Sequence, residues 1–348
     1  MEFQKYFIGR DKSIADAMKK IDDSGHKIIF VTPKGSETGI CGVVTDGDIR
    51  RYLLGGSDLN VPVMEAASKN PIIVRGYHEA KARALLKEEG VTCVPMINAC
   101  GNAHALVFAD ETLHCDTPPV DTPVIVMAGG FGTRLKPYTE ILPKPLIPVG
   151  KVTITEHILN RFKKFGCYNF YLVVNHKRNL IKSYFSEVET GANLEFIDED
   201  VPLGTGGGLS FFKGRFDCPI LVAYCDAVIE ADYTDIVATH VRHGNIFTMV
   251  CAKKSIIFPY GVVEANESGE LIEIKEKPSF DLLTNTGLYV VSPEFIEMVP
   301  DNTFVPITDM AEKCRAAGKR VGVYTIDEEC FIDIGQLEDL KSVEDKLR

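Results

Sequence analysis

The sequence lacks several features that would each point to a large class of proteins. No apolar run approaches the roughly 20 residues needed to span a bilayer, and residues 1–5 do not resemble a signal peptide. The ten cysteines include no C-x-x-C pair, so we expect reduced, mostly buried thiols rather than a disulfide framework. A net charge of −11 argues against a general nucleic-acid binder, which needs a basic face. These absences predict a cytoplasmic protein.

Two nucleotide-binding signatures are also missing. No G-x-x-x-x-G-K-[ST] motif occurs, and the glycines that follow Ala128 come too close together for G-x-G-x-x-G. The sequence fingerprint of an oxidoreductase on a Rossmann-like sheet is therefore missing. That alternative would also require a bound nicotinamide cofactor. No hexapeptide repeat follows at the C-terminal end, so a fused acetyltransferase domain is not expected.

What is present describes a globular protein with more than one domain. The 348 residues are 45% hydrophobic and 25% charged, which is ordinary for such proteins and suffices for two or three domains. Residues 114–123 contain three prolines and little apolar content, as linkers do. We therefore expect an N-terminal domain at 1–115, a linker at 116–122 and a second domain at 123–348.

The N-terminal part has two similar halves. In each half a helix ends at a glycine, Gly25 or Gly90, an offset of 65 residues, and two short apolar strands follow. Each half is too small to bury a good core alone, so we expect the halves to pack on each other. Residues 42–50 (Gly-Val-Val-Thr-Asp-Gly-Asp-Ile-Arg) and 94–97 (Val-Pro-Met-Ile) resemble a tandem pair of cystathionine-β-synthase (CBS) domains.

The CBS resemblance implies a nucleotide site and a route to oligomers. In such pairs the residues corresponding to Thr45 and Asp48 often hold the ribose and phosphate of an adenine nucleotide. A regulatory adenine or guanine nucleotide is therefore a possible partner. The alternative is that Thr45 and Asp48 only cap a short helix and that the pair serves as a dimer interface. The second half lacks the Thr-x-x-Asp pattern, so a nucleotide site there is doubtful.

The C-terminal part alternates strands and helices, which predicts an α/β fold with a parallel or mixed sheet covered on both faces. Ligands bind at the carboxyl ends of the strands in such sheets. The expected strands are 169–174, 194–197, 220–224, 247–252, 261–265, 271–275, 288–291 and 321–326.

A glycine-rich stretch follows the first strand of this part. Its sequence, from Met127, is Met-Ala-Gly-Gly-Phe-Gly-Thr-Arg-Leu. Glycines at this place let backbone N–H groups approach phosphate oxygens. Arg134 adds a planar fork of donors and Lys144 a compact positive charge. Together they predict a site for a polyphosphate.

Two aspartates follow apolar strands elsewhere in this part. Asp226 comes after residues 219–225, and Asp333 comes after Phe331 and Ile332. A carboxylate at the end of a strand can coordinate Mg²⁺. The alternative is that each aspartate is a helix cap or a loop residue, which is the commoner place for a lone aspartate.

The stretch Gly-Gly-x-Gly-Thr-Arg-Leu, with Pro-Lys-Pro-Leu-x-Pro-Val at 143–149, resembles the sugar-1-phosphate nucleotidylyltransferases. Five segments match in the expected order over roughly residues 123–348. The resemblance implies a Rossmann-like mixed sheet, and Mg²⁺ as the cofactor, held by Asp226 and Asp333. It implies a catalytic role for Arg134, Lys144 and Lys277. The implied nucleotide-binding residues are Ala128, Gly129, Gly130, Gly132, Thr133, Asn175, Gly204, Thr205 and Gly207, and the implied sugar-binding residues are Gly261, Glu276, Asn285 and Thr286.

The chain departs from the family pattern at three positions. Many members have Gly or Asn where this chain has Cys225, next to the expected metal ligand. Gly206 and Gly208 replace alanines of the family's Leu-Gly-Thr-Ala-Gly-Ala segment. We expect this replacement to loosen the loop or to admit a bulkier base.

The predicted function is Mg-dependent transfer of a nucleotidyl group from a nucleoside triphosphate to a sugar 1-phosphate, with release of pyrophosphate. The fusion of CBS domains to such a transferase is similar to bacterial guanylyltransferases that act on amino or heptose sugars in surface-glycan pathways. GTP and glucosamine 1-phosphate or a related hexose phosphate are therefore the favoured substrates. The alternative is a nucleotide-sensing regulatory protein with a catalytically inactive transferase-like domain.

Overall fold

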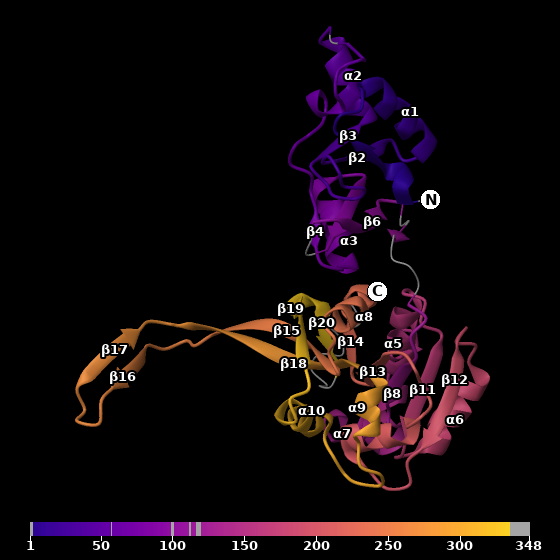
Figure 1. Ribbon diagram of the computed structural model, residues 1–348, viewed down its shortest axis with the longest axis vertical. Coiled ribbons are helices and arrows are strands. Elements are labelled where there is room, and N and C mark those ends of the chain that lie inside the picture. Colours follow the sequence, from indigo (N-terminus) through magenta and orange to yellow (C-terminus); the bar gives the residue numbers. More distant parts are fainter. Residues whose placement is uncertain (1–2, 57, 99–100, 111–112, 116–119, 335–348) are drawn as a thin grey trace. The chain divides into compact units, whose positions relative to one another are not determined.

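The computed structural model describes residues 3–56, 58–98, 101–110, 113–115 and 120–334, and the chain divides into two compact units, Met1–Pro118 and Pro119–Arg348 (Figure 1). Residues 116–119 of the expected linker lie outside the described residues, as do residues 335–348 of the expected second domain. Val120 is bound to the second unit, because its backbone N–H donates to the Phe165 carbonyl at 2.7 Å.

The first half of the N-terminal unit has the expected order of elements. Helix α1 (Ile14–Ser24) begins at a capping box of Ser13 and Asp16 and ends at Gly25, whose φ of 77° is left-handed. A 3₁₀ helix precedes it, and a second α-helix follows the sheet β1-β2-β3. These elements are η1 (Phe3–Tyr6), β1 (Phe7–Gly9), β2 (Ile28–Thr32), β3 (Gly42–Thr45) and α2 (Asp46–Leu54).

The second half repeats the helix followed by two strands. Helix α3 (Glu79–Glu89) ends at Gly90, again in the left-handed conformation. The remaining elements are η2 (Val63–Glu65), β4 (Val74–Arg75), β5 (Cys93–Ile97), β6 (Ala103–Phe108) and β7 (Leu113–Cys115), with the sheet order β4-β5-β6-β7. Phe30 of the first half and Phe108 of the second are buried in one core cluster. The expectation that the halves pack on each other is confirmed.

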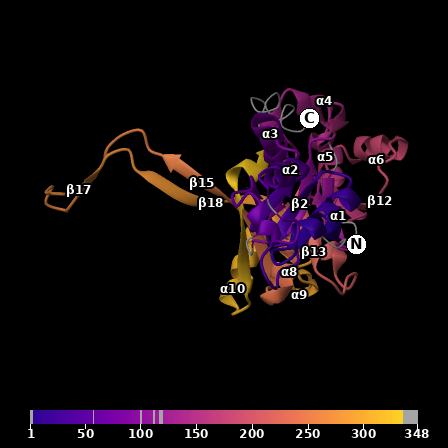
Figure 2. The same ribbon diagram turned by 90° about the horizontal axis from the view of Figure 1, so that it is seen from above.

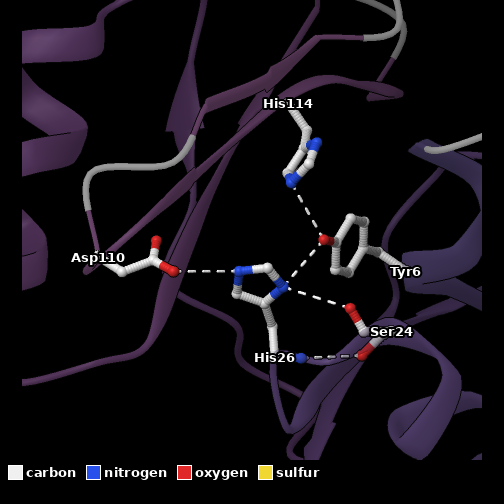
Figure 3. A network of polar contacts seen from close by, with 5 residues as sticks. All are labelled: Tyr6, Ser24, His26, Asp110 and His114. Carbon is white, nitrogen blue, oxygen red and sulfur yellow. Dashed lines mark hydrogen bonds and ion pairs between the residues drawn. The ribbon is translucent and has the colours of Figure 1, made fainter.

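A polar network connects the two halves around the hydroxyl of Tyr6 (Figure 3). This hydroxyl lies 3.0 Å from His26 Nδ1 and 3.1 Å from His114 Nε2. His26 Nε2 in turn lies 3.3 Å from the Asp110 carboxylate. Because Tyr6 is fully buried, the network joins the start of the chain to β7 and satisfies a buried hydroxyl.

The C-terminal unit contains, within its described residues, a seven-stranded mixed sheet. The order is β12 (Asn193–Asp198), β11 (Asn169–Val174), β8 (Val124–Met127), β13 (Ile220–Tyr224), β18 (Ser279–Val291), β15 (Phe247–Ile257) and β19 (Val321–Asp327). The first four strands are parallel, β18 is antiparallel to both of its neighbours, and β15 pairs parallel with β19. The prediction of a mixed α/β sheet is confirmed.

Helices cover both faces of this sheet. On one face, Phe162 of α5 (Ile154–Lys163) stacks on Tyr233 of α8 (Tyr233–Arg242), with ring centroids 4.5 Å apart, above Ala223. Val222, the residue before Ala223 in β13, points to the opposite face of the sheet and packs in the main core cluster. That cluster includes residues of η5 (Gly208–Phe212), α9 (Pro293–Glu297) and α10 (Ile307–Ala316). Helix α6 (Arg178–Glu187) connects β11 to β12. In the described part of the chain, every helix is too short or too polar to cross a membrane.

A long β-hairpin arm leaves the sheet. Strands β15 and β18 continue past the body, and the ribbon of β16 (Val262–Ala265) and β17 (Leu271–Lys275) extends them (Figures 1 and 2). The arm, defined here as residues 253–283, points away from the body in both views. From the sequence, one strand was expected to end at residue 252 and the other to begin at residue 288, whereas in the structure they continue to Ile257 and back to Ser279.

Candidate active site at the carboxyl ends of the parallel strands

Three of the predicted residues meet at the end of β13. The Lys144 Nζ atom lies 2.5 Å from Asp226 Oδ2, and an Arg134 guanidinium nitrogen lies 3.5 Å from the same oxygen. Asp226 follows β13, whereas Arg134 and Lys144 lie in the short 3₁₀ helices η3 (Thr133–Leu135) and η4 (Lys144–Leu146). The sequence prediction that these side chains share a site at the carboxyl end of a strand therefore agrees with their positions.

The three charges differ in exposure. Lys144 is only 8% exposed, so its ammonium depends on the Asp226 carboxylate for compensation. The Arg134 side chain is 61% exposed and reaches the carboxylate from the solvent side. Both cations contact one carboxylate, and the exposed Arg134 guanidinium is placed to meet an anionic ligand that enters the site.

The first glycine-rich loop is shaped by Gly132. Its φ of 63° is left-handed, and a Cβ atom there would lie 2.8 Å from Thr139 Cγ2. The Thr139 hydroxyl donates to the Gly132 carbonyl at 2.9 Å, which closes the loop. A Cβ atom on Gly130, in contrast, would meet no heavy atom within 4 Å. The loop is thus fixed at Gly132 and open at Gly130, where a ligand could approach the backbone.

The second glycine-rich segment is tightly packed. Residues Gly204–Gly207 form the helical turn α7, and a Cβ atom on Gly206 would lie 2.9 Å from the Ile307 backbone nitrogen. The Thr205 hydroxyl accepts a hydrogen bond from that same nitrogen at 3.1 Å. The expectation of a loosened loop was wrong at Gly206, because the missing side chain makes room for the start of α10.

Glu199 is a candidate that the sequence analysis missed. It is 5% exposed, and its Oε1 accepts from Leu203 N at 3.1 Å. Burial raises the pKa of its carboxyl group. A Cβ atom on Gly129 would lie 3.2 Å from Oε2, and one on Gly208 would lie 3.3 Å from Oε1, so the carboxylate sits between the two glycine-rich segments.

Asn175 belongs to the same corner of the site. Its side-chain amide donates to the Glu199 carbonyl at 2.6 Å, across the carboxyl ends of β11 and β12. Glu199 was overlooked because it stands in an acidic run, Asp198, Glu199 and Asp200, and the sequence does not show which of these carboxylates is buried. The available signal was its place directly after a strand, the same signal that identified Asp226.

The two predicted metal ligands occupy neighbouring backbone positions. Strand β20 (Phe331–Asp333) pairs antiparallel with β14 (Ala227–Ile229), with Asp333 opposite Ala227. The Ile334 N–H donates to the Asp226 carbonyl at 2.8 Å. Among the residues that the structure describes, no group of three or more His, Cys, Asp or Glu side chains could hold a metal ion. The carboxyl end of β13 thus offers two carboxylates, those of Asp226 and Asp333. Gly335 of the Asp-x-Gly motif lies outside the described residues.

Cys225, beside Asp226, has an unreactive thiol. Burial raises the pKa of its thiol to about 12, which keeps the sulfur protonated and poorly nucleophilic near neutral pH. All eight cysteines for which the structure describes the side chain are free thiols. The departure from the family pattern at this position therefore introduces no reactive group.

The predicted sugar-binding residues fall into two separate groups. Asn285 and Thr286 lie at the base of the arm, where Asn285 pairs with Cys251. The Asn285 amide donates to the Tyr289 hydroxyl at 2.8 Å. Thr286 is 3% exposed, and its hydroxyl donates to the Val250 carbonyl at the β-bulge in β15.

The second group lies on the arm itself. Gly261 and Glu276 are neighbours there, since a Cβ atom on Gly261 would lie 3.1 Å from Glu276 Oε2. Lys277 follows Glu276 and is eight residues from Asn285 along the chain. At about 3.3 Å per residue, that separation is roughly 26 Å along an extended strand. The structure thus brings Arg134, Lys144, Asp226 and Asp333 together, and it places Gly261, Glu276 and Lys277 elsewhere on the same chain.

In the N-terminal unit, Thr45 and Asp48 form a helix cap. Thr45 Oγ1 accepts from Asp48 N at 3.2 Å, and the Asp48 carboxylate accepts from Thr45 N at 2.9 Å. The capping alternative is therefore what the structure shows, and the nucleotide role of the two residues stays a prediction. A cleft of about 520 Å³ lies close by, between α1 and α2, and its charged lining residues are Lys19, Asp22, Lys27 and Asp46.

Comparison with protein families gives two matches. Residues 123–348 match the model described as "Nucleotidyl transferase", and residues 4–55, the first half of the N-terminal unit, match the CBS domain. Among curated proteins, the chain is 30% identical over 235 residues to a UTP–glucose-1-phosphate uridylyltransferase from Synechocystis sp.. It is 31% identical over 226 residues to a mannose-1-phosphate guanyltransferase from Neurospora crassa. Each match covers 62% of this chain, and the chain spans only 60% and 61% of the lengths of these relatives.

Solved structures show the same fold for the second unit. HddC from Yersinia pseudotuberculosis superposes with a TM-score of 0.53 at 22% identity, covering 65% of this chain and all of that one. The same protein complexed with GMP-PN gives a TM-score of 0.52 at 21% identity, with 65% of this chain and all of the other covered.

Proposed function

Since the chain belongs to the nucleotidyl transferase family, we propose that it transfers a nucleotidyl group from a nucleoside triphosphate to a sugar 1-phosphate. The observation that carries this proposal is the meeting of Arg134, Lys144 and Asp226 beside the open backbone at Gly130. The names of the curated relatives, a uridylyltransferase and a guanyltransferase for sugar 1-phosphates, support the same reaction class.

The proposed chemistry is an in-line displacement. A phosphate oxygen of the sugar 1-phosphate attacks the α-phosphorus of the triphosphate, the bond from that phosphorus to the bridging oxygen breaks, and pyrophosphate leaves. The attacking phosphate is already anionic near neutral pH, so no general base is required. Two anions must approach closely, and unit charges about 4 Å apart repel by several kcal/mol at an intermediate dielectric. Lys144 and Arg134 offset this repulsion and hold the phosphates in position.

Asp226 and Asp333 fit Mg²⁺ as the cofactor. Two carboxylates at neighbouring backbone positions are what Mg²⁺ commonly takes from a protein, with substrate phosphates and water completing its coordination. When bound, the ion supplies neutralisation of the charge that develops on the leaving pyrophosphate. The Lys144 ammonium contacts one of these two carboxylates, that of Asp226.

GTP is the proposed triphosphate. A mannose-1-phosphate guanyltransferase is among the relatives, and Glu199 adds a physical argument. Its carboxylate lies between the glycine-rich loop that is expected to bind the phosphates and the second glycine-rich segment, which the resemblance associates with the base. An ionised carboxylate only accepts hydrogen bonds, and the N1–H and amino group of guanine are two donors side by side, whereas adenine presents an acceptor at N1. Glucosamine 1-phosphate or a related hexose phosphate, for surface-glycan synthesis, remains the proposed acceptor.

A pyrophosphate-release assay tests this function. The full chain is incubated with Mg²⁺ and each of the four nucleoside triphosphates, crossed with glucosamine, mannose, glucose and heptose 1-phosphates. We expect pyrophosphate only when both substrates are present, and fastest with GTP. If no pair releases pyrophosphate while GTP still binds, the alternative of a catalytically inactive, nucleotide-sensing protein replaces the proposal.

For the N-terminal unit we propose binding of an adenine or guanine nucleotide near Thr45 and Asp48, together with homo-oligomer formation through the CBS pair. The nearby cleft supports the proposal by its position, since Asp46 and Ile49 beside the cap are among its lining residues. Calorimetry of the full chain with AMP tests it, because AMP has no pyrophosphate to release. Heat that persists in Asp226→Asn but is lost in Asp48→Ala supports this site. Heat absent from both leaves oligomer formation as the role of the unit.

A further inference from the structure

The arm carries Glu276 and Lys277 away from the other residues that the same substrate would need. If the proposed function holds, the carboxylate of Glu276 and the ammonium of Lys277 serve the same sugar phosphate as the residues around Asp226. Strand β18 begins at the arm and reaches β13 only at Leu288, opposite Ala223. Lys277 is eleven residues before that point, roughly 36 Å of extended chain, which is far longer than a hexose phosphate. The arm as it lies does not complete the site of its own chain.

The distal ribbon of the arm has two different faces. Val263 pairs with Ile274 in register, and residues directly opposite in an antiparallel pair lie on the same face. The adjacent pairs, Glu264 with Glu273 and Val262 with Lys275, bring charge to the other face. A ribbon that is apolar on one side and charged on the other is built to lie against a surface.

Among the residues that the structure describes, the apolar side chains of the arm remain largely uncovered. Eleven large hydrophobic side chains between residues 256 and 283 are each at least 44% exposed, with Ile257 at 67% and Tyr260 at 69%. Successive residues such as Ile256 and Ile257 point to opposite sides of a strand, so these side chains expose apolar surface on both sides of the arm, and monomers rarely expose so much of it. An isolated two-stranded hairpin is also marginally stable in water. The arm therefore needs a surface that the described residues of its own unit do not provide.

We propose that the arm crosses to a second copy of this chain, where it covers the body and supplies Gly261, Glu276 and Lys277 to that copy's active site. The proposal rests on the proposed function for the role of these residues. The occupant is a second copy rather than an unrelated protein because the arm carries site groups as well as apolar surface. Reciprocal exchange by two copies completes both sites and buries both arms.

The body offers a matching surface next to Lys144. Helix α4 (Tyr138–Ile141) follows the glycine-rich loop, and Ile141 is 77% and Tyr138 53% exposed. The Lys177 ammonium donates to the carbonyls of Thr139 and Glu140, at 2.9 and 2.7 Å, and fixes this short helix on the body. Apolar contact with α4 would bring an incoming arm to the site where Arg134 and Lys144 lie.

Complementation between two defective chains tests the exchange. Lys144→Ala disables the body and Lys277→Ala disables the arm. The two chains are co-expressed with different tags, and mixed oligomers are isolated by tandem affinity purification. With exchange, the Lys277→Ala body receives the intact arm of the other chain, so a mixed dimer recovers about half of wild-type pyrophosphate release, one site of two. Arg134→Ala, an exposed position, is a second body-defective partner in case Lys144→Ala folds poorly.

Mixed oligomers that stay as inactive as the two parents overturn the proposal, since each arm would then serve its own chain. Chains that carry Lys144→Ala and Lys277→Ala together, mixed with Lys277→Ala chains, give the control. No site in that mixture has both intact groups, so no recovery is expected.

A photocross-link tests the contact without activity. Tyr260 is replaced by a benzophenone amino acid in the full chain, and the protein is irradiated. We expect a product of twice the chain mass whose linked peptide comes from the α4 region or the segment around Asp226. A link only within one chain, or none, contradicts exchange. The same replacement at Tyr168, 48% exposed on the body, is the control and should not give that product. If wild type releases no pyrophosphate, the proposed function fails while this result still decides where the arm binds.

Discussion

The Lys144 ammonium lies 2.5 Å from the Asp226 carboxylate, although 82 residues separate them in sequence. The glycine-rich loop and β13 bring them together, and the low exposure of Lys144 makes the contact a partly buried ion pair. Arg134 approaches the same oxygen from solvent. Asp226 is therefore the centre around which both cations of the proposed phosphate site are arranged.

Replacing Lys144 by alanine should lower turnover by about 100-fold or more, because a positioned cation that offsets phosphate repulsion is lost. The fold should persist, since Arg134 still partners Asp226. Pyrophosphate release and circular dichroism are the two measurements. Lys213→Ala, which removes a surface ion pair with Asp301, is the matched control and should keep normal turnover. Near-normal turnover in Lys144→Ala would remove this residue from the mechanism.

Gly132→Ala should destabilise the C-terminal unit by about 1–3 kcal/mol, because alanine resists a φ of 63° and its Cβ atom meets Thr139. Gly130→Ala is the matched control in the same loop, where nothing lies within 4 Å of the added carbon. Thermal unfolding of both variants measures the difference. Equal melting temperatures would mean that the loop adapts to either residue.

Glu199→Gln should reduce the preference for GTP over ATP by about 10-fold, since a carboxamide no longer presents two acceptors to the guanine donors. The kcat/KM values for both triphosphates are compared with wild type. Glu195→Gln, a change on the exposed surface of β12 next to Arg215, is the control and should leave the preference as it is. If the ratio of the two kcat/KM values were unchanged in Glu199→Gln, the carboxylate would have only a structural role, as the acceptor of the hydrogen bond from Leu203 N.

Stability of the C-terminal unit should fall as the pH drops from 7 to 5, because of His240. This side chain is 1% exposed, and its ring nitrogens lie 2.8 Å from Thr248 Oγ1 and 3.0 Å from Ser292 Oγ. Burial lowers its pKa to about 4. Below the unfolded pKa of about 6.5 the unfolded chain binds a proton that the folded chain does not, and the loss reaches about 2 kcal/mol at pH 5.

Denaturant unfolding at pH 7 and at pH 5 measures this loss. In His240→Asn the proton-linked contribution is absent, so its two free energies of unfolding should lie closer together than those of wild type. An identical pH dependence in the two proteins would show that other groups cause it.

Much of the fold follows from local patterns in the sequence. Gly25 and Gly90 end helices because each adopts a left-handed conformation that favours glycine, and both ends were predicted. Asn169–Val174 and Ile220–Tyr224 form strands over the expected residues because each run is short and largely apolar. The convergence of Lys144 on Asp226 was predicted from a resemblance together with the rule that ligands bind at strand ends.

The arm was not predicted, because local patterns do not show where a strand leaves its sheet. Lys253 and Lys254 ended the apolar run of one strand, so the strand was assumed to stop, yet its backbone pairing with Leu283 and Leu282 continues. The resemblance placed Glu276 and Asn285 in one pocket, since it records order along the chain and not position in space. Glu199 escaped notice because an acidic triplet gives no sign of which carboxylate is buried.

The alternation along β16 and β17 makes the arm sensitive to the length of its strands. Side chains change sides at every residue of a strand. Deleting one residue from each strand, between the body and the pair Val263–Ile274, would therefore turn the ribbon over. Glu264 and Glu273 would then point toward the surface that Val263 and Ile274 now face. Substitutions on the charged side leave that phase intact. Among homologues, the charged side of the arm should therefore vary freely in composition. The number of residues between the β-bulge and Val263 should change only by even numbers, because an odd change would exchange the two sides.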